Sequence, residues 1–426
     1  MRSEGVKAAL LVAALCGCAG EMKHTKVTKL PQEAFPILGL EKIGNITSME
    51  SLGDVLYVAG EQGLGAVRAN GSVVWTLGLP KASLRSLAVE GARIVFTSYS
   101  LQDSGGLSVY GFGFDSASGY LGCAVGLATT QGSLVWTTPC GEGEAASPPA
   151  IGAGRVGVSH GKYFGIYDLG SGRRVSHTQI GMQIPVLATG SMARASYNRP
   201  AFLDGSFYVG HLHKFVRIDP GGEIEIESRG FSIFRPFENI TVGPLLVGNV
   251  LVFAGMSSDV GESSRLYAAD KSCAQVWTQR LGDSESGVGS LAVRGDRLYV
   301  ATNNQLFAYK ASGERLWRQS GGWPLSPSSL RGVRTVSGAT SLNSTPLNMA
   351  FMSRRWNGSL LEATDERVFL ASAIEGRGDA LTVLDAATGQ YIETRTFGGA
   401  KILDLALMGG KLAVATENGL HLLSVK

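Results

Sequence analysis

A unit of two consecutive β-hairpins recurs through almost the whole sequence and constrains the fold more than any other feature. In each unit an apolar strand and a short turn precede an alternating strand such as VLYVAG, RLYVAT or KLAVAT. The first turn is recognisable eight times, from Gly53-Asp54 to Gly409-Gly410, at an average spacing of about 51 residues, which is typical of repeat architectures. Alternation of apolar, β-branched and aromatic residues predicts half-buried strands, and short glycine-rich turns join such strands as hairpins.

The second hairpin of the unit follows one template. Segments 64–75 (LGAVRANGSVVW), 124–136 (AVGLATTQGSLVW) and 306–317 (LFAYKASGERLW) superimpose on it. Four of the six tryptophans occupy the same position on the last strand: Trp75, Trp136, Trp277 and Trp317. In the third and fourth units, Val175 and Ile226 are expected at this position. One large aromatic per unit fills the space between neighbouring sheets, so we expect core residues rather than a cofactor site.

These segments resemble the quinoprotein-type β-propeller repeat, whose core reads approximately L-Y-A-L-D-A-x-T-G-x-x-x-W. Segments 381–392 (LTVLDAATGQYI) and 124–136 are the best copies, and the resemblance covers about residues 40–426. It implies an all-β propeller of four-stranded antiparallel blades, which we place at residues 35–426. Eight first hairpins predict eight blades, with seven as the alternative if the third or fourth unit is not a separate blade.

Closure of the ring needs one more strand, because the eighth unit ends after its third strand, at Lys426. An unpaired strand edge is a liability in a sheet. The apolar segment Phe35–Ile43 (FPILGLEKI) precedes the first unit. We therefore expect an N-terminal strand from this segment to complete the eighth blade.

The N-terminus has the pattern of a lipoprotein signal. Residues 1–17 combine basic residues, a short apolar run and small residues, as in a secretory signal peptide, and the run is too short to span a bilayer. Leu15-Cys16-Gly17-Cys18 resembles a bacterial lipobox, which predicts lipidation of Cys18; an ordinary cleaved signal is the alternative. Residues 18–34 are then a polar tether. Ala19 after the acceptor favours the outer membrane, by resemblance to enterobacterial lipoproteins.

Composition and motifs narrow the function classes. Lys and Arg number 38 against 35 Asp and Glu, with no basic run, which argues against nucleic acid as a partner. Quinoprotein dehydrogenases carry a vicinal cysteine pair and calcium-binding carboxylates, whereas this chain has no adjacent cysteines. The zinc-protease and nucleotide-binding motifs are missing too. We expect no catalytic residue and no cofactor; an enzyme or small-ligand binder in the central funnel is the alternative.

Two cysteines face each other across the second hairpin of the second unit. Cys123 and Cys140 are equidistant from the turn at Gln131-Gly132. Regular pairing would bring them within disulfide reach, but a bulged turn would shift the register and separate them. Their bonding stays open at this point, and Cys273 is expected to be a free thiol.

Histidines provide weak candidates for a metal site. His160 and His211 occupy the same template position in the third and fourth units, at the turn between the second and third strands, and His213 follows. Three imidazoles on one rim could approach each other, although zinc needs three or four ligands near tetrahedral geometry. Solvent-exposed polar rim residues are the alternative, and we expect no bound metal.

Insertions fall on one side of the predicted ring. They lie between second and third strands or between blades, at Ser98–Gly122, Thr178–Asn198, Arg229–Asn239, Met256–Arg265 and Ser320–Arg355. Both kinds of connection open on the same face of a propeller, and loops on a rigid scaffold commonly carry recognition. Exposed aromatic residues favour a protein partner. The partner-binding candidates are Phe112, Phe234, Arg235, Phe237 and Trp323.

Lipobox, length and blade count together resemble the BamB family of outer-membrane assembly lipoproteins. The resemblance implies a periplasm-facing scaffold, held to the outer membrane by its lipid, that binds envelope proteins. In that family the partner is the periplasmic part of the barrel protein BamA, and the role is to help fold and insert outer-membrane β-barrel proteins. A scaffold of a different envelope complex is the alternative. No partner-contacting residue of the family is carried over to this chain.

Overall fold

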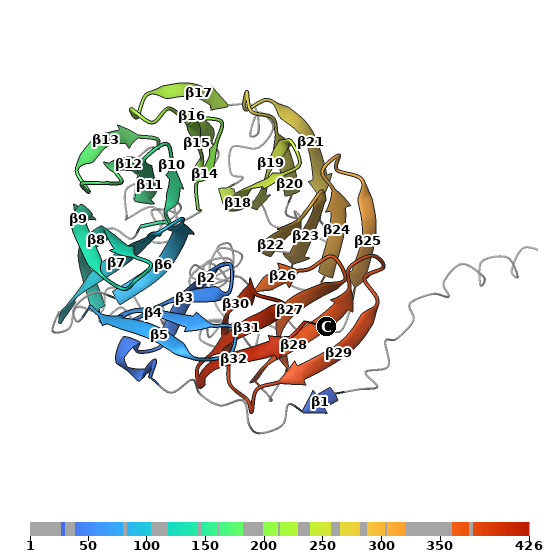
Figure 1. Cartoon of the computed structure of the whole chain (residues 1–426). Coiled ribbons are helices and arrows are strands. Elements are labelled where there is room, and N and C mark those ends of the chain that lie inside the picture. The colour runs from blue at the N-terminus through green and yellow to red at the C-terminus, as the bar shows by residue number, and fades with distance from the viewer. Residues whose placement is uncertain are drawn as a thin grey trace, which may run out of the picture.

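Eight β-sheets stand around a central axis as the blades of a ring (Figure 1). The computed structural model describes residues 27–29, 39–79, 83–103, 118–142, 146–160, 162–181, 199–211, 214–228, 239–256, 265–281, 288–302, 305–320, 360–374 and 378–425. Each of the first seven blades has four antiparallel strands in sequence order from the axis outward. The predicted all-β, eight-bladed propeller is therefore confirmed.

The first four blades take up the N-terminal half of the ring. Their strands are β2 (Ile46–Leu52), β3 (Val55–Gly60), β4 (Gly63–Arg68) and β5 (Val73–Gly78); β6 (Ser83–Glu90), β7 (Arg93–Asp103), β8 (Ser118–Thr129) and β9 (Leu134–Glu142); β10 (Ala150–Gly152), β11 (Arg155–His160), β12 (Tyr163–Asp168) and β13 (Arg174–Gln179); β14 (Ala201–Leu203), β15 (Ser206–His211), β16 (Lys214–Ile218) and β17 (Ile224–Ser228).

The last four blades complete the ring. Their strands are β18 (Asn239–Val247), β19 (Val250–Met256), β20 (Arg265–Ala269) and β21 (Gln275–Arg280); β22 (Val288–Arg294), β23 (Arg297–Thr302), β24 (Gln305–Lys310) and β25 (Arg315–Ser320); β26 (Leu361–Ala363), β27 (Arg367–Ile374), β28 (Gly378–Asp385) and β29 (Tyr391–Thr396); β30 (Ile402–Met408), β31 (Lys411–Thr416) and β32 (Gly419–Ser424).

Tryptophans on the outer strands join each blade to the next, as the repeat predicts. The indole N–H of Trp75 donates to the carbonyl of Thr130 at 2.8 Å, and that of Trp136 donates to the carbonyl of Leu169 at 3.1 Å. Trp277 and Trp317 repeat the contact in later blades. Each ring lies flat on a turn glycine of the next blade, where a Cβ would overlap it; these glycines are Gly132, Gly172, Gly313 and Gly389. The tryptophans are therefore blade-to-blade core.

Blades three, four and seven depart from this arrangement. In blade seven Glu393 holds the tryptophan position, opposite Val383. The departure in blade three corrects the sequence alignment. In blade three the tryptophan position is taken by Ser176, which pairs with Ile166, and not by Val175. The turn before it has one residue more than in blades one and two, so the register moves by one. In blade four Ile226 does hold the position, as expected. The facing turn of blade five has Cys273 at φ 60°, in place of glycine. Isoleucine is smaller than tryptophan and leaves room for this side chain.

The N-terminal segment closes the ring differently from the expectation. Residues 35–38 lie outside the described part, and Glu41–Ile43 form a 3-10 helix (η1) instead of a strand. The reason is local, because Gly39 and Gly44 adopt positive φ and interrupt an extended backbone. Leu40 and Ile43 are buried between blades one and eight. The helical turn therefore seals the seam by packing.

The described N-terminal strand lies on another blade. The strand β1 (Val27–Lys29) pairs in parallel with β29, as a fifth strand on the outer edge of blade seven. Within the described residues, blade eight has the three strands β30, β31 and β32. The prediction that an N-terminal strand completes blade eight is thus wrong for residues 41–43.

Candidate functional site

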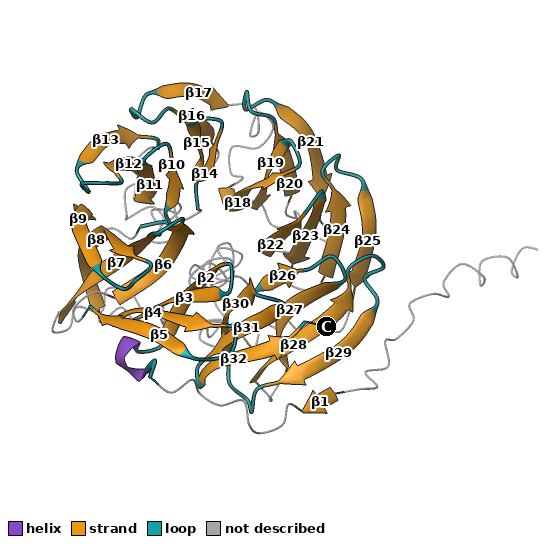
Figure 2. Ribbon diagram, in the orientation of Figure 1, coloured by secondary structure: helices purple, strands orange, loops and turns teal. Residues whose placement is uncertain are grey.

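The two faces of the ring differ in their connections. On one face lie the short turns between first and second and between third and fourth strands, such as 53–54 and 69–72; we name it the short-turn face (Figure 2). On the other face lie the connections between second and third strands and between blades; we name it the loop-rich face. The long gaps between described segments, at 104–117, 182–198, 229–238, 257–264 and 321–359, all begin and end there.

The topology therefore confirms that the long connections lie on one face. The partner-binding candidates Phe112, Phe234, Arg235, Phe237 and Trp323 belong to these gaps and lie outside the described residues. Their sequence positions place them in loop-rich-face connections, and their contacts stay a prediction.

Blade two contributes a projecting hairpin to the loop-rich face. Strands β7 and β8 have 11 and 12 residues, whereas the corresponding β3 and β4 of blade one have 6 each. They pair as far as Asp103 and Ser118, so part of the expected loop Ser98–Gly122 is strand. Five further residue pairs at about 3.3 Å each extend this hairpin by roughly 16 Å beyond the corresponding hairpin of blade one.

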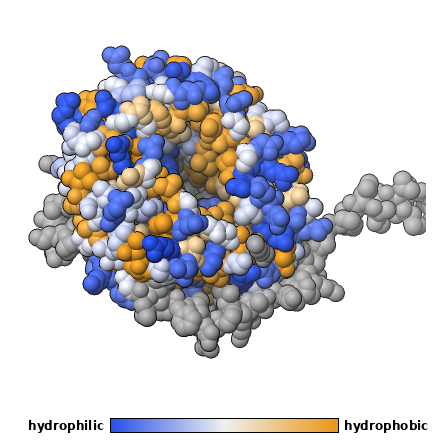
Figure 3. Space-filling view, viewed as in Figure 1, coloured by the Kyte–Doolittle hydropathy of each residue, from blue (hydrophilic) through white to orange (hydrophobic). Residues whose placement is uncertain are grey.

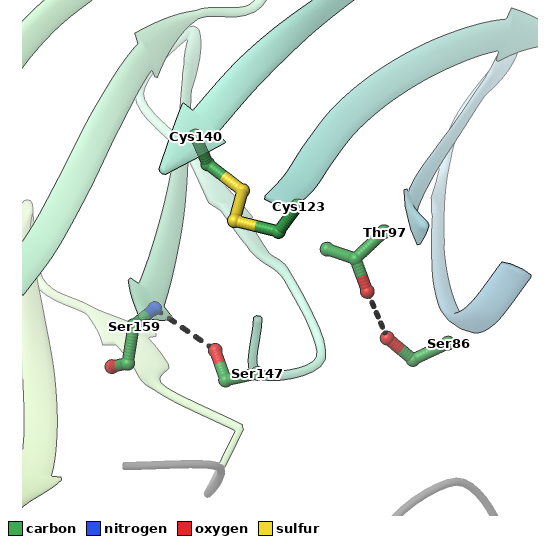
Figure 4. The surroundings of a disulfide bond; sticks show 6 residues. All are labelled: Ser86, Thr97, Cys123, Cys140, Ser147 and Ser159. Carbon is green, nitrogen blue, oxygen red and sulfur yellow. Dashed lines mark hydrogen bonds between the residues drawn. A yellow bond between two sulfur atoms is a disulfide. The ribbon is translucent and has the colours of Figure 1, made fainter. Parts of the chain in front are cut away.

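A disulfide ties the base of this hairpin to the outer strand β9 (Figure 4). Cys123 and Cys140 are bonded, with their Cα atoms 5.3 Å apart. A bulge near the turn shifts the register, and a second bulge between Cys123 and Ala124 pairs Cys123 with Gly141, so that Cys140 is the extra residue beside this pair. Both sulfurs are buried beside the Ser86–Thr97 and Ser147–Ser159 hydrogen bonds. The hairpin is therefore anchored where it leaves the ring.

The remaining cysteine of the propeller is not a reactive group. Cys273 is 2% exposed and has no disulfide partner. Burial raises the pKa of its thiol to about 12. Because the thiolate is the nucleophile, this residue is a packing residue rather than a catalytic one.

The histidine candidates do not form a metal site in the described residues. His160 ends β11 and His211 ends β15, so both hold the expected equivalent positions, while His213 lies outside the described part. His160 is 1% exposed, which excludes the alternative of a solvent-exposed rim residue. Its ring stacks on that of His177, with centroids 5.0 Å apart, and His177 stacks on Tyr163. Among the residues that the structure describes, no three His, Cys, Asp or Glu side chains gather as metal ligands.

The central opening, visible in Figure 3, is bordered by the inner strands. Among the described residues, Arg199 and Glu50 form an ion pair between two of the blades that surround it. The guanidinium of Arg199, just before β14, donates to a Glu50 carboxylate oxygen at 3.2 Å and to the Leu87 carbonyl at 2.6 Å. These two acceptors belong to β2 and β6, so the contact links blade four to blades one and two. Sequence reasoning missed this pair, because neither residue stands in a motif.

The described part of the chain contains no helix with the length and the apolar character of a membrane span.

Comparison with known proteins gives one family and two informative structures. Residues 262–425 match the sequence profile of a family described as outer membrane protein assembly factor BamB. The crystal structure of BamB from Moraxella catarrhalis aligns with 88% of this chain and 95% of its own, at 15% identity and a TM-score of 0.57. A search of curated proteins finds no matching sequence.

The second structure shows that a similar fold does not by itself indicate a similar function. A computationally designed protein, Ika8, aligns with 90% of this chain and 97% of its own, at 11% identity and a TM-score of 0.59. Since a designed ring fits as well as BamB, these likenesses establish the architecture alone. By repeat and by architecture, the chain is a PQQ-like β-propeller that resembles the outer-membrane assembly factor BamB.

Proposed function

We propose that the chain is a lipid-anchored scaffold of the bacterial envelope that assists the assembly of outer-membrane β-barrel proteins. The observation that carries this proposal is the match of residues 262–425 to the assembly-factor family, on a ring that also resembles a solved BamB. The role is that of a binding protein, in which a rigid ring holds loops for partners. The partner expected from the resemblance is a barrel-assembly protein of the outer membrane.

The loop-rich face is the binding surface in this proposal. It receives the long connections and the projecting hairpin of blade two, whose base is fixed by the Cys123–Cys140 bond. A rigid base lowers the entropy that a partner would otherwise have to remove on binding. Aromatic and Arg side chains are the usual anchors of protein interfaces. Phe234, Arg235 and Phe237 stand together in one loop-rich-face connection and are the first choice.

Attachment to the outer membrane through Cys18 is the second part of the proposal. Its support is the segment Leu15-Cys16-Gly17-Cys18, followed by Ala19. Lipid chains on Cys18 would hold the ring on the periplasmic side without a membrane span. The Cys18→Ala variant should therefore move from the membrane fraction to the soluble periplasm. Membrane association of that variant in high salt would contradict the anchor.

Cross-linking in the living envelope, followed by mass spectrometry, tests the partner. Recovery of a barrel-assembly protein supports the proposal, and recovery of an unrelated complex contradicts the assembly role. The double change Phe234→Ala and Phe237→Ala should weaken capture by roughly tenfold or more, since each anchor is worth about 2 kcal/mol and 1.4 kcal/mol is a factor of ten. Loop residues contribute little to blade packing, so the melting temperature should stay unchanged.

The matched control is on the opposite face. Changes to alanine at Asn70, Ser171 and Thr388, in turns between third and fourth strands, should leave capture intact. If these changes abolish capture while the phenylalanine changes do not, the binding face is the other one.

A further inference from the structure

The direction of β1 shows from which face the N-terminal tether reaches the ring. In each of the first seven blades the fourth strand follows a short turn and runs toward the loop-rich face. The strand β29 does so after the turn at 386–390, and β1 runs parallel to it, with Val27 opposite Thr394 and Lys29 opposite Thr396. The N-terminal end of β1 therefore points toward the short-turn side, from a position beside the second half of β29 at the outer edge of blade seven.

The chain between the lipid site and β1 is short. Eight residues separate Cys18 from Val27. At no more than about 3.6 Å per residue, these two Cα atoms are at most roughly 32 Å apart. A lipid on Cys18 would thus keep the outer edge of blade seven within that distance of the bilayer, and β1 enters this edge from the direction of the short-turn side.

Exposed apolar side chains give an independent indication of the same face. Among the described residues, all eight large apolar side chains that are exposed lie within three residues of a short turn; they are Leu52, Val74, Leu134, Val135, Ile224, Leu246, Val276 and Ile392. Val276 is 53% exposed and Val135 is 50% exposed. They come from five blades, namely one, two, four, five and seven, so they are spread around the ring near the short turns instead of forming one groove.

We propose that the short-turn face is the membrane-facing surface of the protein and rests on phospholipid headgroups, with the blade-seven edge nearest the tether. This inference rests on the lipid anchor of the proposed function. The apolar side chains on this face suit the boundary between headgroups and acyl chains. The loop-rich face then points away from the bilayer and stays open to protein partners.

Energy transfer to the membrane tests this orientation. The lipidated full chain is reconstituted into phosphatidylethanolamine–phosphatidylglycerol vesicles that carry an acceptor dye on the headgroups. The donor is attached either at Asn70→Cys, on the short-turn face, or at Glu61→Cys, on the loop-rich face. Both positions are exposed and flank the same strand, β4, whose six residues at about 3.3 Å each separate them by roughly 20 Å. Cys273 is buried and the other two cysteines of the propeller are bonded, so each variant has one labelling site.

We expect at least twofold higher transfer from position 70 than from position 61. Equal transfer, or higher transfer from position 61, would overturn the orientation. Failure of the lipidated protein to bind the vesicles at all would instead overturn the anchor, and with it this inference.

A pair of proline variants tests whether the pairing of β1 with blade seven orients the ring, separately from the exposed apolar side chains. Of two successive strand residues, one points its backbone N–H at the neighbouring strand, and proline has no N–H. The double variant with Val27→Pro and Thr28→Pro should therefore remove the pairing of β1 with β29. This variant should move the transfer ratio toward one, while Lys23→Pro with His24→Pro, in the tether, should leave it unchanged. If the β1 variant keeps the full ratio, the pairing of β1 does not orient the ring.

Discussion

A carboxylate oxygen of Asp404 accepts the backbone N–H of Met49 at 2.6 Å, across 355 residues of sequence. Asp404 is on β30, the inner strand of blade eight, and Met49 is on β2, the inner strand of blade one. Ser51 adds a second contact by donating to the Leu407 carbonyl. At this junction the last blade of the chain meets the first, and side chains hold the two blades together. Blades one, two and six have a buried serine at the position of Asp404.

Replacement of Asp404 by alanine should therefore destabilise the propeller. The change leaves the buried N–H of Met49 without an acceptor, which costs about 1–3 kcal/mol. The measurement is the free energy of unfolding in urea. Asp296→Ala is the control, because Asp296 is exposed in a short turn, and it should stay within about 0.5 kcal/mol of the wild type. Equal loss in both variants would mean that the Asp404 contact does not hold the seam.

Truncation of Ile43 tests the helical turn at the same seam. Ile43 is fully buried in a cluster with residues of blades one and eight. Ile43→Ala should cost about 2–5 kcal/mol, as for other buried isoleucines. Ile392→Ala removes the same group from an exposed position and should cost far less. Similar unfolding midpoints for the two variants would show that η1 is not part of the core.

Most of the ring could be predicted from local pattern. Period-2 alternation, the short turns and the regularly spaced tryptophans are features of a single blade. Because the blade repeats eight times, a misread copy does not change the predicted fold. Features that depend on the sequence of a single blade were predicted less accurately. One added residue in the blade-three turn exchanged Val175 for Ser176, and two glycines converted the end of Phe35–Ile43 from a strand into a helical turn.

The site was less predictable, because its contacts join residues that are far apart in the chain. Arg199 and Glu50 are 149 residues apart and share no motif. His177 on β13 stacks on His160 of β11 because both strands pair with β12, and no feature of the sequence marks His177. Symmetric counting pairs Cys123 with Cys140, whereas a bulge that it cannot show pairs Cys123 with Gly141 and leaves Cys140 beside it, still within disulfide reach. Such pairs become visible only once the register of every strand is known.

Reduction of the disulfide should destabilise the chain and loosen the blade-two hairpin. The bond closes a loop with a sequence separation of 17, for which chain entropy corresponds to about 3 kcal/mol. We expect reductant to lower the free energy of unfolding of the wild type by up to that amount. The variant with Cys123→Ser and Cys140→Ser should not respond to reductant. Cys273→Ser should respond like the wild type, and loss of the response there would implicate a different bond.

Acidification should weaken blade eight through His421. Burial lowers the pKa of His421 below its usual value of 6.5, and its ring lies 5.0 Å from that of Phe397 and 3.1 Å from the Thr416 hydroxyl. Since the folded-state pKa lies below the unfolded one, the unfolded chain binds the proton more tightly. Stability is therefore present above about pH 6.5 and is lost as the pH falls below that value. We expect His421→Gln to lose less stability than the wild type between pH 7.5 and pH 5, in urea unfolding at each pH. His24→Gln, N-terminal to the propeller, should keep the wild-type dependence, and identical pH profiles for all three proteins would contradict this role of His421.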